Sequence, residues 1–214
     1  MIEGVRVKVC GVTDLENAVE VARCGVNAIG LNFVSGSPRE VAREDARRIA
    51  SALPPEVWVV GVVANMDVPG MRALKREVGL DAIQMHGDES PETVAALAPF
   101  AWKAIRVSNR EDVRASTRYL HAQILYDARS TKALGGTGER FDWALLEARE
   151  DPRPFVLAGG LDESNVAEAV ERTRPWMVDV ASGVEAPSGP RGIKDIERVR
   201  RFVHAARRAK MGPP

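Results

Sequence analysis

The sequence predicts one (β/α)8 TIM barrel over residues 1–210, with a parallel eight-stranded sheet. Three observations support this prediction: strand-like and helix-like segments alternate, the strand-like segments are almost continuously apolar, and two late strands end in glycine-containing pairs, Gly159-Gly160 and Ser182-Gly183. Strict alternation predicts a parallel sheet, and apolar strands predict that both of its faces are covered. The chain has 214 residues, near the lower end of the size of this fold, about 200 to above 400 residues.

Eight strand-like runs follow one another along the chain. They begin near Arg6, Asn27, Val57, Leu80, Trp102, Ala122, Pro154 and Pro175. The segments between and after them have the apolar period of helices. These helical segments are residues 14–24, 40–53, 68–78, 91–98, 141–148, 164–172 and 194–208. The second and sixth strands are followed by the longest connections, so residues 34–39 and 128–140 should form long loops at the catalytic face.

A doubly wound open sheet is the alternative fold. It predicts a glycine-rich dinucleotide fingerprint after the first strand, and the sequence there, CGVTD from Cys10, does not match it. The barrel is therefore favoured, and no redox cofactor is expected. The last four residues, 211–214, should form a disordered tail.

Composition restricts the partners that the chain could have. Thirty basic residues balance thirty acidic ones, so there is no basic field for nucleic acid. The apolar runs are too short to span a bilayer, and Glu3 and Arg6 stand where a signal peptide needs an apolar region. Two cysteines are too few for a disulfide framework or a cysteine zinc site. We expect a cytoplasmic protein with a small-molecule partner, no metal and no membrane contact, as a monomer or homodimer.

Two glycine-opened strand ends predict a phosphate site. The strand-like run 177–181 leads into Ser182 and Gly183, and the run 155–158 leads into Gly159 and Gly160. A phosphate needs converging backbone N–H groups with no side chain in the way, and small residues at a strand end supply them. Either pair alone could be an ordinary turn. Together, on the last two strands of a barrel, they favour phosphate binding.

Cys10 ends the first strand, where a barrel places its chemistry. Buried cysteines are more often plain apolar residues, but this position favours a chemical role. To act as a base, the thiol needs nearby positive charge or dipoles that help it to ionise. A disulfide to Cys24 is excluded because the intervening helix would separate the two residues by about 15 Å at 1.5 Å per residue.

Asp127 ends the sixth strand, directly before the long glycine-containing loop. A carboxylate at the end of an apolar strand costs free energy unless it is paired or functional, so we favour a functional role over a helix cap. The loop beyond it contains Gly135, Gly136 and Gly138, and it could be a lid or merely a flexible connection.

Other charged residues near strand ends are candidates for substrate contacts. Arg39 follows Ser37 and Pro38 in the loop after the second strand, and arginine suits bidentate binding of a carboxylate or phosphate. Lys8 shares a strand face with Cys10, so it points into the barrel and needs a partner, for which we suggest Asp179. His86 is more simply a hydrogen-bonded histidine beside the site than an acid or base.

The sequence resembles the phosphoribosylanthranilate isomerases. The motifs KVCGVTD, SGSPR, QMHGDES, LYDARS, GGTGERFDW, LAGGL and VDVASGVE carry this resemblance over almost the whole chain. It implies that Cys10 is the general base and Asp127 the general acid. It further implies that Arg39 holds the substrate, with His86 and Asp179 beside it, and that Gly159, Gly160, Ser182 and Gly183 surround the phosphate.

The resemblance has two departures, which adjoin the substrate loop. Glu40 stands where the family often has an aromatic residue, and Asn32 stands where it usually has a hydrophobic one. Both could affect substrate affinity, and neither touches the acid or the base.

The implied reaction needs only one acid and one base. The acid protonates the ring oxygen of an aminated ribose, and the base then removes the C2 proton. Two other functions stay open on sequence alone: another phosphate-binding barrel enzyme, such as an indole-forming lyase or synthase, or a non-catalytic barrel that binds sugar phosphates. The first would use lysine or glutamate at strand ends, and the second would not need both Cys10 and Asp127.

Overall fold

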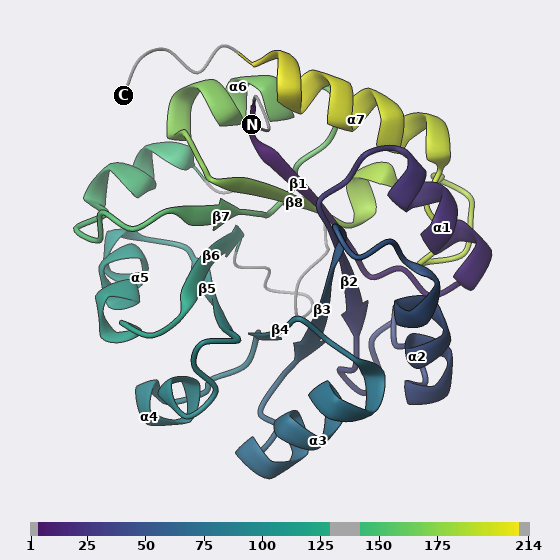
Figure 1. Cartoon of the computed structure of the whole chain (residues 1–214). Helices are drawn as coiled ribbons and strands as arrows, with labels where there is room; N and C mark the ends of the chain where they lie inside the picture. Colours follow the sequence, from purple (N-terminus) through teal and green to yellow (C-terminus); the bar gives the residue numbers. More distant parts are fainter. Residues whose placement is uncertain (1–3, 129–141, 210–214) are drawn as a thin grey trace.

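The eight predicted strands form a closed parallel barrel in sequence order (Figure 1). The computed structural model describes residues 4–128 and 142–209. The strands are Arg6–Cys10 (β1), Ala28–Asn32 (β2), Trp58–Val63 (β3), Ala82–Met85 (β4), Ala101–Val107 (β5), Gln123–Ala128 (β6), Phe155–Leu157 (β7) and Met177–Val180 (β8). β1 pairs with β8, which closes the ring. The predicted barrel is confirmed, and the doubly wound alternative is wrong.

Helices surround the ring of strands in Figure 1. The α-helices are Leu15–Arg23 (α1), Arg43–Ala52 (α2), Val68–Val78 (α3), Pro91–Ala95 (α4), Arg110–Arg114 (α5), Val166–Thr173 (α6) and Ile196–Arg208 (α7). Three 3-10 helices complete the described elements: Ala115–Arg118 (η1), Trp143–Ala148 (η2) and Ser182–Val184 (η3). Side-chain caps fix several helix starts. Asp14 Oδ1, for example, accepts a hydrogen bond of 2.8 Å from Asn17 N at the start of α1.

Two helical segments differ from the sequence prediction. The predicted helix at 141–148 is the 3-10 helix η2 in its described part, and the short helices α5 and η1 between β5 and β6 were not predicted. Only Val113 in α5 and Ser116 in η1 are buried. That is too little apolar period to indicate a helix from sequence.

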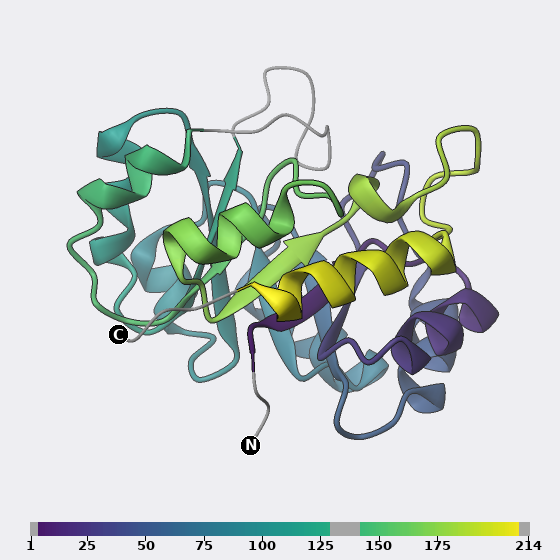
Figure 2. The same ribbon diagram turned by 90° about the horizontal axis from the view of Figure 1, so that it is seen from above.

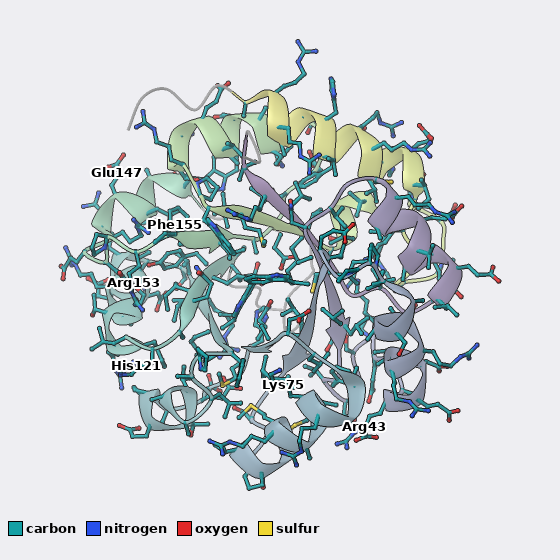
Figure 3. All side chains as sticks on the ribbon, viewed as in Figure 1. Arg43, Lys75, His121, Glu147, Arg153 and Phe155 are labelled. Atoms are coloured by element: carbon teal, nitrogen blue, oxygen red, sulfur yellow. The ribbon has the colours of Figure 1, made fainter. Side chains whose placement is uncertain are left out.

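The barrel interior changes from apolar to charged along its axis. Its N-terminal half contains an apolar cluster with members such as Val60, Trp102, Leu125 and Val156. In the next layer Lys8 stands opposite Asp179 in the β1–β8 register. Side chains from all sides fill the centre of the ring in Figure 3. The interior is a packed core, and among the described residues a cavity opens toward the C-terminal ends of the strands.

Three tryptophans gather at the N-terminal end of the strands. The ring centroids of Trp58, Trp102 and Trp176 lie 6.1 to 6.3 Å from one another. The guanidinium of Arg6 stacks on Trp176, with its central carbon 4.8 Å from the ring centroid. This end of the barrel is therefore closed by aromatic packing.

Some predictions fall outside the residues that the structure describes. The glycine-containing loop, at residues 129–141, and the tail at 211–214 belong to this group. The single-domain boundary at residue 210 stays a prediction. None of the described helices is long and apolar enough to cross a membrane.

Candidate active site

A cavity of about 400 Å³ opens at the C-terminal ends of the strands. The connections that follow the strands shape its rim, and the β8–α7 connection rises above the strand ends in Figure 2. Eight of the nine site residues expected from the sequence line this cavity: Cys10, Arg39, His86, Asp127, Gly159, Gly160, Asp179 and Ser182. One cavity therefore brings together predicted residues from Cys10 to Ser182, which are 172 positions apart in the chain.

Cys10 reaches the cavity from the end of β1 and is partly exposed there. Its neighbour across the β1–β2 pairing is Gly30. A Cβ atom at Gly30 would lie 2.7 Å from Cys10 Sγ, so this glycine leaves the space that the thiol occupies. Burial raises the pKa of the Cys10 thiol, and the positive charges of Lys8 and Lys194, which act to lower it, do not offset that effect. Positive charge lies near Cys10 as expected, but it does not make the thiol acidic.

Lys8 and Asp179 form the buried ion pair that strand geometry predicted. Lys8 Nζ lies 2.8 Å from Asp179 Oδ2, and neither side chain is more than 7% exposed. Burial acts to lower the pKa of Lys8, but Asp179 and Cys10 outweigh it and raise that pKa, so the ammonium stays charged. The second oxygen, Asp179 Oδ1, has no hydrogen-bond partner among the described residues.

Asp127 and His86 lie side by side at the ends of β6 and β4. His86 Nε2 lies 3.2 Å from Asp127 Oδ2, although the two atoms are not aligned as a hydrogen bond. On the other side of the ring, Nδ1 lies 3.2 Å from Gln84 Nε2. With this amide orientation Gln84 donates to Nδ1, so the proton of a neutral imidazole sits on Nε2 and faces Asp127. His86 thus lies against Asp127 in the cavity lining, without a hydrogen bond between the two side chains.

Arg39 is buried at the cavity wall by two contacts. Its Nε and Nη2 atoms donate to the two carboxylate oxygens of Glu185, at 2.7 and 2.8 Å. Its aliphatic stem packs on Gly11, where a Cβ atom would lie 2.4 Å from Arg39 Cδ. Gly11 also has a φ of +70°, a conformation that side chains disfavour. Arg39 was predicted as a substrate contact; the structure places it at the cavity wall, with its guanidinium held by Glu185.

The pairs Gly159-Gly160 and Ser182-Gly183 differ in why they contain glycine. Gly159 has a φ of +90°, and a Cβ atom there would lie 2.4 Å from the amide nitrogen of Ala128 and 3.0 Å from Asp127 Oδ1. Ser182 lines the cavity and begins the one-turn helix η3. Gly183 lies outside the cavity lining, and a Cβ atom there would lie 2.0 Å from the Leu161 carbonyl oxygen. Gly183 is thus required first for close packing of two backbones.

The two departures from the family pattern stabilise the loop between β2 and α2. Asn32 Nδ2 donates to Ser37 Oγ at 2.9 Å, and Asn32 Oδ1 accepts from Val34 N at 2.8 Å. Glu40 Oε2 accepts from Gly36 N at 2.9 Å. These contacts order the segment that ends at Arg39. Both residues therefore act on the shape of the cavity rim.

Sequence reasoning missed four polar residues around the cavity: Gln84, Glu185, Arg191 and Lys194. Glu185 is within the VDVASGVE motif, but its partners Arg39 and Lys194 come from different loops, and no local pattern joins them. Gln84 could have been found, because it shares a strand face with His86 two residues later. Within residues 4–128 and 142–209, no group of three or more His, Cys, Asp or Glu side chains could hold a metal ion.

Comparison with known proteins identifies the family. Residues 7–205 match the family model described as N-(5'phosphoribosyl)anthranilate (PRA) isomerase. The N-(5'-phosphoribosyl)anthranilate isomerase of Myxococcus xanthus is 46% identical over 208 residues, which cover 95% of this chain and 96% of that protein.

Solved structures agree with the sequence relatives. The phosphoribosyl anthranilate isomerase of Thermotoga maritima superposes with a TM-score of 0.85 at 37% identity, covering 94% of this chain and 98% of that one. A structure of such an isomerase in complex with reduced 1-(o-carboxyphenylamino)-1-deoxyribulose 5-phosphate superposes with a TM-score of 0.81 at 36% identity, over 94% and 98% of the two chains. The chain therefore belongs to the N-(5'-phosphoribosyl)anthranilate isomerase family.

Proposed function

We propose that the chain converts N-(5-phosphoribosyl)anthranilate to 1-(2-carboxyphenylamino)-1-deoxyribulose 5-phosphate, in tryptophan biosynthesis, with Cys10 as general base and Asp127 as general acid. The observation that carries the assignment is that both residues, from β1 and β6, line one cavity at the C-terminal ends of the strands. Strands one and six lie far apart around the ring in Figure 1, so the two side chains approach a bound sugar from different sides. A sugar between them can receive a proton at one atom and lose one at another.

The reaction proceeds by two proton transfers. Asp127 donates a proton to the ribose ring oxygen, the C1–O bond breaks, and the nitrogen lone pair forms a protonated Schiff base with C1. Cys10 thiolate then removes the proton from C2, and the electrons of that bond form an enolamine. Tautomerisation of the enolamine gives the ketose, so the overall atom count is unchanged.

Anchors away from the reacting carbons align the substrate. Gly159, Gly160, Ser182 and Gly183 are proposed to surround the phosphate, and Arg39 to bind the anthranilate carboxylate. Gln84 Oε1 and Asp179 Oδ1 are buried acceptors without a partner among the described residues. A buried acceptor that lacks a hydrogen bond costs free energy. Hydroxyl groups of the bound sugar are therefore suited to donate to these two oxygens.

Complementation tests this function directly. The gene should rescue a tryptophan auxotroph that lacks this isomerase, and a Cys10→Ser, Asp127→Asn double variant expressed at the same level should not. Failure of the native gene, with purified protein that binds the product but does not turn over substrate, would favour the non-catalytic sugar-phosphate barrel instead. An indole-forming activity would be detected by assaying the purified protein for indole derivatives.

Assembly and location remain predictions. The chain is expected to be a monomer or homodimer, which light scattering on the purified protein would decide. A cytoplasmic location is expected for the same protein in its source cell. Its partner is a small phosphoribosyl compound, with no nucleic acid.

A further inference from the structure

Glu185 is a buried carboxylate at the junction of two loops that line the cavity. It follows η3, is 3% exposed and is not part of the cavity lining. Besides the two bonds from Arg39, it accepts hydrogen bonds from Arg191 Nη1 at 3.1 Å, Lys194 Nζ at 2.9 Å and Gly192 N at 3.0 Å. One carboxylate therefore ties three cationic side chains and one backbone amide together.

The carboxyl group of Glu185 is held in its ionised form. Burial acts to raise the pKa of Glu185, but hydrogen bonds from Arg39 and the charge of Lys194 outweigh burial and hold the pKa well below its usual range. Three cations around one anion leave an excess of positive charge. Arg39 and Arg191 present this charge at the cavity wall, which suits a negatively charged ligand.

The geometry of the Arg39 pair decides which part of the guanidinium is left for a ligand. Glu185 occupies the edge formed by Nε and Nη2. A guanidinium has five N–H donors, and its other edge, Nη1 with Nη2, is also a two-pronged donor. Among the described residues, Nη1 of Arg39 has no hydrogen-bond acceptor that competes for this edge. The packing of the stem on Gly11 prevents the side chain from swinging away.

We propose that Glu185 is a positioning residue for substrate recognition: it holds Arg39 by the Nε edge so that the Nη1–Nη2 edge meets the aromatic carboxylate of the substrate. This inference rests on the proposed role of Arg39. Glu185 does not touch the substrate, and it acts through the orientation of Arg39 alone. It therefore contributes to binding of substrates with a carboxylate and does not contribute to proton transfer at Cys10 or Asp127.

The test compares two substrates in the Glu185→Gln variant: N-(5-phosphoribosyl)anthranilate and the phosphoribosyl aniline that lacks the carboxylate. Glutamine keeps the size of Glu185 but brings an NH2 group toward Arg39, so the fork loses its alignment. We expect KM for the natural substrate to rise about 10- to 100-fold, because small displacements of an anchoring group have effects of this order. KM for the aniline analogue, and kcat for both substrates, should stay close to those of the native enzyme.

A matched control is available at the opposite end of the barrel. Asp151 is another buried carboxylate, whose two oxygens each lie 2.9 Å from Nε of Arg153. Arg153 also donates to the Ala122 carbonyl, in the connection that leads into β6, and it lies outside the ring of strands in Figure 3. Asp151→Asn should lower the melting temperature and leave KM for both substrates unchanged.

The outcomes separate this inference from the proposed function. Arg39→Lys should raise KM for the natural substrate about 10- to 100-fold because lysine lacks the two-pronged donor, and native kinetics in that variant would remove Arg39 from substrate binding altogether. If Arg39→Lys is impaired and Glu185→Gln is not, only the positioning role fails. Equal KM increases for both substrates in Glu185→Gln would also overturn it, because they would indicate a general loss of loop structure.

A second variant covers the case in which Glu185→Gln does not fold. Glu185→Asp keeps the charge but is one methylene shorter, so it cannot reach all five donors at once. The same selective rise in KM for the carboxylate-bearing substrate supports the inference. An unchanged ratio of KM values for the two substrates would contradict it.

Discussion

The two ends of the barrel are built from different kinds of interaction. At the N-terminal end the rings of Trp58, Trp102 and Trp176 pack against one another at tilted angles, with centroids 6.1 to 6.3 Å apart. Toward the C-terminal end the interior holds the Lys8–Asp179 pair and, at the cavity rim, the Arg39–Glu185 pair. The barrel interior passes from aromatic packing to charged pairs within the length of one strand, β1, which runs from Arg6 to Cys10.

This difference separates stability from function. A buried large apolar side chain stabilises the folded state by about 1.5 to 3 kcal/mol, whereas a buried ion pair often contributes nothing compared with apolar residues of the same size. The ion pairs of the charged end are therefore no better for stability than apolar residues of the same size, although removal of one partner would leave a buried charge unpaired. The carboxylate of Glu185 orients Arg39. The charges of Lys8, Lys194 and Asp179 act on the Cys10 thiol.

At the charged end, Asp127→Asn should have the largest effect on activity. The amide keeps the shape of Asp127 but cannot deliver the proton, so kcat should fall by about two to four orders of magnitude. Product affinity, measured by calorimetry, should change little because the phosphate and carboxylate anchors are elsewhere. The melting temperature should not fall. Retention of more than a tenth of native kcat would remove Asp127 as the acid.

At the apolar end, Trp102→Ala should lower stability and leave activity unchanged. Trp102 is 4% exposed and Trp58 is 43% exposed. Truncating the buried ring should lower the free energy of unfolding by about 3 to 5 kcal/mol, and Trp58→Ala, as the exposed control, by about 1 kcal/mol. Urea unfolding measures both. Under conditions where Trp102→Ala is folded, its kcat/KM should equal that of the native enzyme, and a clear loss would mean that the two ends are coupled.

On the proposed base, Lys194→Met should have the smallest effect of the three, a shift in pH dependence; it also removes one of the five donors to Glu185. Burial raises the pKa of Cys10 and Lys194 acts to lower it, so removing Lys194 destabilises the thiolate. The thiolate forms as pH rises, so the alkaline rise in kcat/KM should move to higher pH, by about one unit or less. A rise that moved to lower pH, or did not move, would show that Lys194 does not act on the base.

Much of the fold could be predicted from the sequence. Strands such as β3, with the sequence WVVGVV, are continuous apolar runs with clear ends. β1 was predicted with its observed bounds, Arg6–Cys10. The Lys8–Asp179 pair followed from alternation along β1 and from closure of the ring, which places strand eight beside strand one. The helices α5 and η1 escaped prediction because too few of their residues are buried.

The rule that located the proposed acid and base is that a polar side chain near the C-terminal end of a barrel strand faces the site. Cys10 and Asp127 satisfy that rule, and both line the cavity. Glu185 does not, because its role depends on Arg39, 146 positions earlier in the chain. The reason for glycine at position 183 was also hidden, since it comes from the Leu161 carbonyl of the preceding βα connection. Contacts between loops depend on how the barrel closes, and local pattern does not encode them.

The pH dependence of kcat/KM for the native enzyme and for Cys10→Ser tests the central claim most directly. If Cys10 is the base, the native profile rises through the alkaline range, because burial raises the pKa of the thiol. Serine keeps the size but is a far weaker base, so the variant should lose this rise and most of its turnover, about two to four orders of magnitude, while it still binds product. If Cys10→Ser kept most of its activity and the same pH profile, Cys10 would not be the base, and His86 would be the next residue to mutate.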